Sequence, residues 1–229
     1  YAVDGPVNMV RLSELIDHVT KPELRFPPYA PMYPAKLANT DLFAVIGKHD
    51  VLLHHPFQSF QPVLEFIRSA AQDPDVVAIK QTIYRTGMNS DLMESLIIAA
   101  QRGKEVTVVV ELMARFDEEA NINWADRLER AGAQVVYGVV GLKTHAKLAL
   151  VIRREHGALR YYAHMGTGNY HPSTTKFYTD FGLLTANPAI ATEVNEVFIH
   201  LTSLTKPKKL EHLWLAPFAL QKEFILAIR

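Results

Sequence analysis

Segments typical of β-strands alternate with segments typical of α-helices along most of this 229-residue chain. Helical apolar spacing and helix-ending glycines place the expected helices at residues 58–71, 91–102, 118–131 and 189–201. Apolar or alternating patterns place the expected strands at residues 51–54, 75–84, 105–112, 133–138, 147–152, 159–164 and 180–184. This alternation predicts an α/β layered domain, with a mostly parallel mixed sheet and helices on its faces.

The first part of the chain follows a different pattern. A short helix is expected near residues 11–19, but five prolines between residues 22 and 34 interrupt any longer one. We therefore expect residues 1–45 to be the tail of a preceding domain plus a Pro-rich linker. Residues 46–202 are then the main layered domain, and residues 203–229 are a linker and the start of a following domain.

Composition narrows the kinds of site that this chain can hold. The absence of Cys excludes disulfides and thiolate metal sites, and is compatible with a cytoplasmic protein. The 24 Lys and Arg residues are balanced by 24 Asp and Glu residues, so a phosphate site must be a local cluster of cations. No Walker A motif occurs, which excludes nucleotide binding through a P-loop.

Two short motifs favour phosphoryl chemistry. His145 and Lys147 are two residues apart, so on a β-strand both side chains would leave the same face. Residues 166–169, Gly-Thr-Gly-Asn, form a glycine-flanked turn that ends in the carboxamide of Asn169. A nucleophilic imidazole, a fixed cation and an amide donor around one point suit attack of the histidine on phosphorus.

Two arginines follow expected strands. Arg85 comes after the strand at residues 75–84, and Arg115 comes after the strand at residues 105–112. Ligands of α/β sheets bind at the carboxyl ends of parallel strands, and guanidinium groups suit bidentate contacts with phosphate. This placement predicts one site that both arginines share.

The motifs resemble one half of the phospholipase D active site, His-x-Lys followed by Gly-Ser-x-Asn. Three further segments resemble bacterial polyphosphate kinase of the large, histidine-phosphorylating type; they are residues 83–85, 111–121 and 178–180. The resemblance extends from roughly residue 27 to residue 202. Phospholipase D sites carry an Asp five residues after the Lys, where this chain has Ile152, which argues against a phospholipase or nuclease.

The resemblance implies that His145 accepts the γ-phosphoryl group of ATP as a phosphohistidine. The group then passes to inorganic polyphosphate, and the reverse reaction makes ATP. Lys147 and Asn169 would stabilise phosphoryl oxygens, and Tyr178 would contact the nucleotide. Asp180 would orient an imidazole, by analogy that of a second half-site.

The resemblance also associates Arg85 and Arg115 with Mg²⁺, which would enter together with ATP. Because a guanidinium group has no lone pair for a metal, we expect contact through Mg²⁺-bound phosphates. The implied partners are ATP, ADP and inorganic polyphosphate, with no nucleic acid. The full-length protein would be a cytoplasmic homo-oligomer, and the resemblance allows peripheral association with a membrane.

Sites of this superfamily need two halves, whereas the chain carries a single His-x-Lys sequence, at residues 145–147. We therefore expect it to be the central part of a longer protein and to be inactive alone. Two alternatives remain open from the residues. One is a phospholipase D-type phosphodiesterase, and the other is a phosphate- or nucleotide-binding module without catalysis.

Overall fold

The structure is a computed structural model, and it divides into two compact units, Tyr1–Ala30 and Pro31–Arg229. It describes residues 2, 4–5, 8–27, 29–85, 87, 90–112, 114, 118–139, 141–203, 205 and 207–229. The first unit holds a 3-10 helix at Met9–Ser13 that continues into one α-helical turn, α1 (Glu14–Asp17). The helix expected near residues 11–19 is therefore the end of a 3-10 segment followed by a single α-helical turn. A further 3-10 turn spans Pro22–Leu24.

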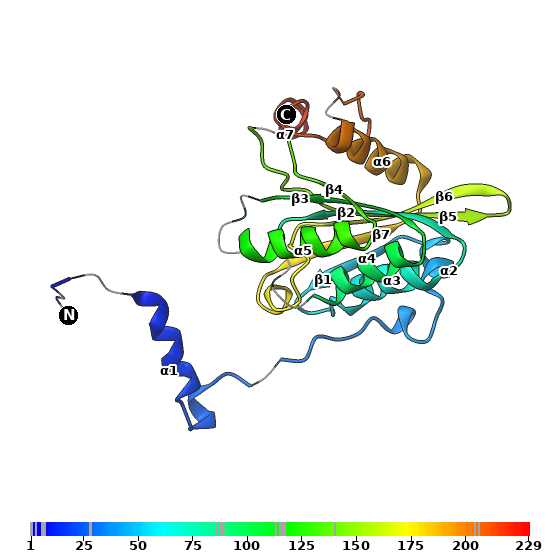
Figure 1. Cartoon of the computed structure of the whole chain (residues 1–229). Helices are drawn as coiled ribbons and strands as arrows, with labels where there is room; N and C mark the ends of the chain where they lie inside the picture. Colours follow the sequence, from blue (N-terminus) through cyan, green and yellow to red (C-terminus); the bar gives the residue numbers. More distant parts are fainter. Residues whose placement is uncertain are drawn as a thin grey trace. The chain divides into compact units, whose positions relative to one another are not determined.

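In the described part of the second unit, seven strands form one sheet with the order β1-β7-β6-β5-β2-β3-β4 (Figure 1). The strands are β1 (Val51–His55), β2 (Val76–Ile83), β3 (Glu105–Val110), β4 (Gln134–Val136), β5 (Lys147–Glu155), β6 (Ala158–Gly166) and β7 (Asp180–Thr185). Each of them matches a strand predicted from the sequence, with small differences at the ends. The α/β class is confirmed.

The pairing of the strands differs from the prediction. β2, β3 and β4 are parallel to one another, whereas the other neighbouring pairs in the described sheet are antiparallel. The expectation of a mostly parallel sheet is therefore wrong. The reason is local: His156 and Gly157 both have positive φ, at 50° and 82°, and form the tight turn of a β5–β6 hairpin. β7 then pairs with β6 without a helical crossover.

Helices cover both faces of the sheet. α2 (Leu42–Ile46), α3 (Gln61–Gln72), α4 (Asp91–Gln101) and α5 (Glu118–Arg130) lie on one face, and α6 (Pro188–Ser203) lies on the other (Figure 1). Successive side chains of β2 point to opposite faces of the sheet. Ile79 packs in the core beneath the first group of helices, and Ala78 packs in the core beneath α6. The sequence did not predict the last helix, α7 (Leu220–Ile228). None of the described helices is long and apolar enough to cross a membrane.

The strand ends that carry the sequence motifs meet at one edge of the sheet. Across the ladder, Lys147 at the start of β5 lies opposite Gly166 at the end of β6, and Gly166 lies opposite Gly182 of β7. Asp180 at the start of β7 lies opposite His55 at the end of β1. Two 3-10 turns complete the unit, at Ala35–Leu37 and Thr174–Lys176. The expected domain boundaries, after residues 45 and 202, remain predictions.

Candidate active site

His145 lies in the loop before β5, which begins only at Lys147. The prediction that one strand carries both side chains is therefore wrong. The ring of Tyr84 brings them together instead. The His145 ring meets it edge-on with the centroids 4.8 Å apart, and Lys147 Nζ lies 5.0 Å from its centroid. Lys147 Nζ also donates a hydrogen bond to the backbone oxygen of His145 at 2.6 Å.

Arg85 joins the same cluster. It follows β2 directly, and its Cζ lies 5.6 Å from the centroid of the Tyr84 ring. Its charge lowers the pKa of both His145 and Lys147. Arg85, His145 and Lys147 therefore surround one aromatic ring, although sequence analysis gave Tyr84 no role. The available signal was its place between a buried strand and Arg85.

The surroundings of His145 favour the neutral form of its imidazole. Partial burial of the ring lowers its pKa, and the charges of Lys147, Arg85 and Lys143 lower it further. A neutral imidazole has a free lone pair at physiological pH and can act as a nucleophile. Burial also lowers the pKa of Lys147 to about 8; the charge of Asp180 opposes this shift and that of Arg85 adds to it.

The Gly-Thr-Gly-Asn turn is held against Asp180. Thr167 Oγ1 donates to Asp180 Oδ1 at 2.8 Å and accepts the N–H of Phe181 at 2.9 Å. A Cβ on Gly168 would lie 2.3 Å from Asp180 Oδ2, so the close approach requires glycine. Asn169 is half-buried, and its Oδ1 is buried without a hydrogen-bond partner among the described residues.

In the described part of the chain, no hydrogen bond, ion pair or ring contact joins two of the predicted site residues to this cluster. Tyr178 is 65% exposed in the loop between the 3-10 turn at Thr174–Lys176 and β7. Asn169 makes no described contact with His145, although its turn begins opposite Lys147. Arg115 lies outside the described residues. The roles of these three residues remain predictions.

A buried histidine pair beside Asp180 was missed by sequence analysis. A Cβ on Gly182 would lie 2.8 Å from His164 Nε2 and 3.4 Å from His55 Nε2, so both rings converge on this glycine. His164 Nδ1 is hydrogen-bonded to the hydroxyl of Tyr170 at 2.7 Å. Burial lowers the pKa of both histidines. Neither residue lies in a recognisable motif, so the pairing of β1, β6 and β7 is what reveals them.

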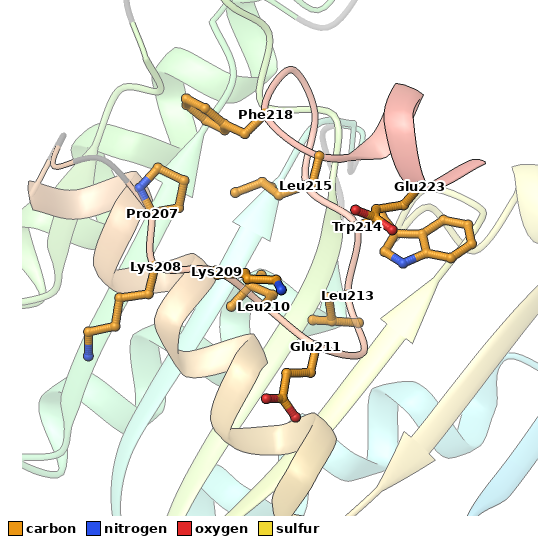
Figure 2. A pocket seen from close by; sticks show the side chains of 11 residues that line it. Pro207, Lys208, Lys209, Leu210, Glu211, Leu213, Trp214, Leu215, Phe218 and Glu223 are labelled. Atoms are coloured by element: carbon orange, nitrogen blue, oxygen red, sulfur yellow. The ribbon is translucent and has the colours of Figure 1, made fainter. Parts of the chain in front are cut away.

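A cavity of about 420 Å³ opens beside His145. Its wall combines Lys143 and His145 with apolar side chains of α6 and of the following segment, among them Val197, Leu201 and Trp214. A second cavity lies within the C-terminal segment, where Leu213, Leu215 and Phe218 surround it (Figure 2). No predicted site residue lines that second cavity. Of the predicted site residues, His145 alone lines the first one among the described residues.

The described residues do not fit direct coordination of a metal ion. No group of three or more His, Cys, Asp or Glu side chains among them could hold one. Arg85 cannot ligate a metal because its guanidinium group has no lone pair. It does fit the phosphate oxygens of a metal–nucleotide complex, which is an anion.

Sequence comparison points to one family. The description "Polyphosphate kinase C-terminal domain 1" belongs to the family model that matches residues 41–207. The polyphosphate kinase of Paraburkholderia phytofirmans is 57% identical over 234 residues, which cover 100% of this chain and 34% of that protein. That of Neisseria meningitidis serogroup A is 55% identical, covering 98% and 33%. The chain spans about a third of the length of these relatives.

Comparison with solved structures indicates the same family. The crystal structure of polyphosphate kinase from Porphyromonas gingivalis matches with a TM-score of 0.79 and 35% identity, covering 90% of this chain and 35% of that one. Nuc from Salmonella typhimurium, a phospholipase D family member, matches with a TM-score of 0.53, covering 70% and 98%. At 15% identity this second match shows the fold alone. The predicted phospholipase D-like fold is confirmed.

Proposed function

Since this chain belongs to the polyphosphate kinase family, we propose that the protein containing it transfers the γ-phosphoryl group of ATP to inorganic polyphosphate and back. The observation that carries the proposal is the cluster at Tyr84. There an imidazole with a lowered pKa lies beside two cationic side chains, Lys147 and Arg85. This combination suits a nucleophile that attacks an anionic phosphoryl group.

In the proposed reaction, a nitrogen of neutral His145 attacks the γ-phosphorus of ATP and the bond to the bridging oxygen of ADP breaks. Lys147 and Arg85 stabilise the charge on the phosphoryl oxygens in the transition state. The terminal oxygen of a polyphosphate chain then attacks the phosphohistidine, and His145 leaves as a neutral imidazole. Mg²⁺ enters as part of the nucleotide substrate, and no protein ligand for it is proposed.

The other site residues keep the roles that the family implies. Asn169 would donate to phosphoryl oxygens, Tyr178 would contact the nucleotide, and Arg115 would bind phosphate together with Arg85. Asp180 would orient the imidazole of a second half-site, supplied by the part of the relatives that this chain does not span. On this proposal the isolated chain is inactive, because it holds one His-x-Lys sequence.

A phosphodiesterase of the phospholipase D type is the competing function. Such sites carry an Asp five residues after the Lys, but Ile152 at this position is 9% exposed and packs in the core under α6. An ionised carboxylate would be costly there. The observation favours phosphoryl transfer over phosphodiester hydrolysis. A binding module without catalysis is the remaining alternative for the chain alone.

We further propose that the longer protein is a cytoplasmic homo-oligomer that can associate peripherally with a membrane. These properties rest on the family and not on any contact in this chain. They are separate from the chemistry at His145, so their failure would leave the proposed reaction unchanged.

Steady-state assays of the longer protein test the function. With Mg²⁺ present, it should make polyphosphate from ATP and make ATP from ADP and polyphosphate. His145→Ala should reduce both rates by about 10³-fold or more, because the covalent nucleophile is lost. His49→Ala, at an exposed position outside the site, is the matched control and should retain both rates. Retained synthesis in H145A, or hydrolysis of bis(4-nitrophenyl) phosphate in place of synthesis, would overturn the proposal.

A further inference from the structure

Two buried polar side chains hold the backbone on either side of His145. Glu111, which follows β3, accepts the N–H of Thr144 with Oε2 at 2.7 Å. Thr82 in β2 donates its hydroxyl to the backbone oxygen of Ala146, also at 2.7 Å. The side chains are well shielded from water, since Thr82 is 1% exposed and Glu111 is 5% exposed. His145 is therefore the one residue between two anchored neighbours.

We call Thr82 and Glu111 the anchors of this loop. The Thr82 hydroxyl takes the place of backbone hydrogen bonds where the pairing of β2 with β5 ends. Backbone pairing between β2 and β5 extends to Gln81 and Ala149. One residue further, Thr82 Oγ1 accepts the N–H of Leu148 at 2.9 Å while it donates to Ala146. A hydroxyl can donate and accept at the same time, so one side chain closes the strand and fixes the start of the loop.

Asn121 of α5 connects Glu111 to the segment that follows β2. Its Nδ2 donates to the backbone oxygen of Glu111 at 2.9 Å and to that of Tyr84 at 3.0 Å. Asn121 is fully buried, and Tyr84 provides the ring against which the His145 imidazole packs. The ends of β2 and β3 are thus tied to each other as well as to the loop.

We propose that Thr82 and Glu111 are positioning residues that aim His145 at the phosphorus atom; this inference rests on the proposed function. With both neighbours fixed, the imidazole is left with rotation about its own side-chain bonds. Nucleophilic attack requires a narrow geometry, so a loop held in this way increases the rate of phosphohistidine formation. Neither residue needs to touch the substrate.

Substitutions at Thr82 offer an almost isosteric test in the longer protein. Thr82→Val removes the hydroxyl and keeps the shape, and Thr82→Ser keeps the hydroxyl. At saturating ATP, T82V should slow phosphohistidine formation by about 10²-fold, the loss expected from misplacing a reacting group. The KM for ATP should stay near the wild-type value. T82S should restore most of the rate, and Thr107→Val, at a buried threonine of β3, should not slow it.

Hydrogen exchange at single amides tests the anchors without any activity measurement. In T82V the Leu148 amide should exchange faster, and in Glu111→Ala the Thr144 amide should exchange faster, because each loses its acceptor. Glu111→Gln keeps an acceptor oxygen and should lie between wild type and E111A in both exchange and rate. T107V should leave both amides unchanged.

The outcomes separate this inference from the function on which it rests. If T82V and E111A leave both amides protected, the anchors do not hold the loop and the inference fails. If protection is lost but phosphohistidine forms at the wild-type rate, the positioning role fails. If the wild-type protein forms no phosphohistidine, the proposed function fails, and the positioning role fails with it while the exchange data still report on the anchors.

Discussion

The charge of Lys147 depends on what occupies the site. Burial lowers the pKa of this lysine to about 8 in the free chain, so at higher pH it is mostly neutral. A bound phosphate would raise the pKa again, and binding at about pH 9 should therefore take up a proton. Isothermal titration calorimetry measures this uptake. The chain is titrated with tripolyphosphate at about pH 9 in two buffers of different ionisation enthalpy, and the difference between the two binding enthalpies gives the number of protons taken up.

Two variants decide whether Lys147 is the group that takes up the proton. Lys147→Met should abolish the uptake and weaken binding. Lys176→Met removes an exposed lysine outside the cluster and should preserve both. Equal proton uptake by wild type and K147M would show that another group titrates.

His164 should make the fold sensitive to acid. Burial, with a smaller contribution from the charge of His55, lowers the pKa of His164 to about 3. In the unfolded chain the pKa is about 6.5, so below that pH the unfolded state binds a proton that the folded state excludes. The free energy of unfolding should therefore be unaffected by this residue above about pH 6.5 and should fall as the pH decreases toward 3.

Urea denaturation at several pH values measures this dependence. His164→Gln removes the titrating group and should give a shallower decrease of stability with acid. His49→Gln, at an exposed histidine, should keep the wild-type slope. An unchanged slope in H164Q would mean that His164 is already protonated in the folded state.

Among single residues, those in the sequence motifs could be predicted from the sequence. The residues that hold the backbone around these motifs could not. His145, Lys147 and Arg85 could be found because their chemistry and spacing are informative. Thr82 and Glu111 could not, because a buried Thr or Glu acquires its role only when distant backbone groups are brought to it. Glu111 and Thr144 are 33 positions apart in the sequence, so no local pattern signals their hydrogen bond.

Among the elements, the turn after β6 is the most sensitive to added volume. Gly168→Ala would place a Cβ 2.3 Å from Asp180 Oδ2, so the turn or the carboxylate must move. We expect a loss of stability of about 1–3 kcal/mol, the usual cost of overpacking. The loss should be smaller in an Asp180→Ala background, where the carboxylate is absent. A double-mutant cycle from urea denaturation checks this, and equal losses in both backgrounds would contradict the contact.

The elements themselves were easier to predict than their pairing. Apolar periodicity located each strand and the helices from α3 to α6, because it reflects which side of an element is buried. It does not encode the direction of a neighbouring strand. The sheet is therefore less parallel than predicted. β5 begins at Lys147 as predicted, which leaves His145 in the loop before it, so the two side chains do not share one strand.

For the whole molecule, the central feature is that the residues of the proposed half-site lie within a chain that spans about a third of the length of the relatives. Arg85, the pair His145 and Lys147, and Asp180 come from three separate stretches of the chain, and the strand order brings them to one edge of the sheet. We expect this edge to form in the isolated chain, because its anchors lie within residues 31–229. Catalysis should nevertheless require the longer protein.

Labelling with γ-³²P-ATP and Mg²⁺ tests whether His145 carries the phosphoryl group, with the longer protein, its H145A and H49A variants, and the isolated chain in parallel. We expect acid-labile, base-stable label on the longer protein, mapped by peptide analysis to His145. The label should be absent from H145A, retained in H49A and absent from the isolated chain. Label that persists in H145A, or polyphosphate synthesis by a protein that never becomes labelled, would show that transfer does not proceed through phosphorylated His145.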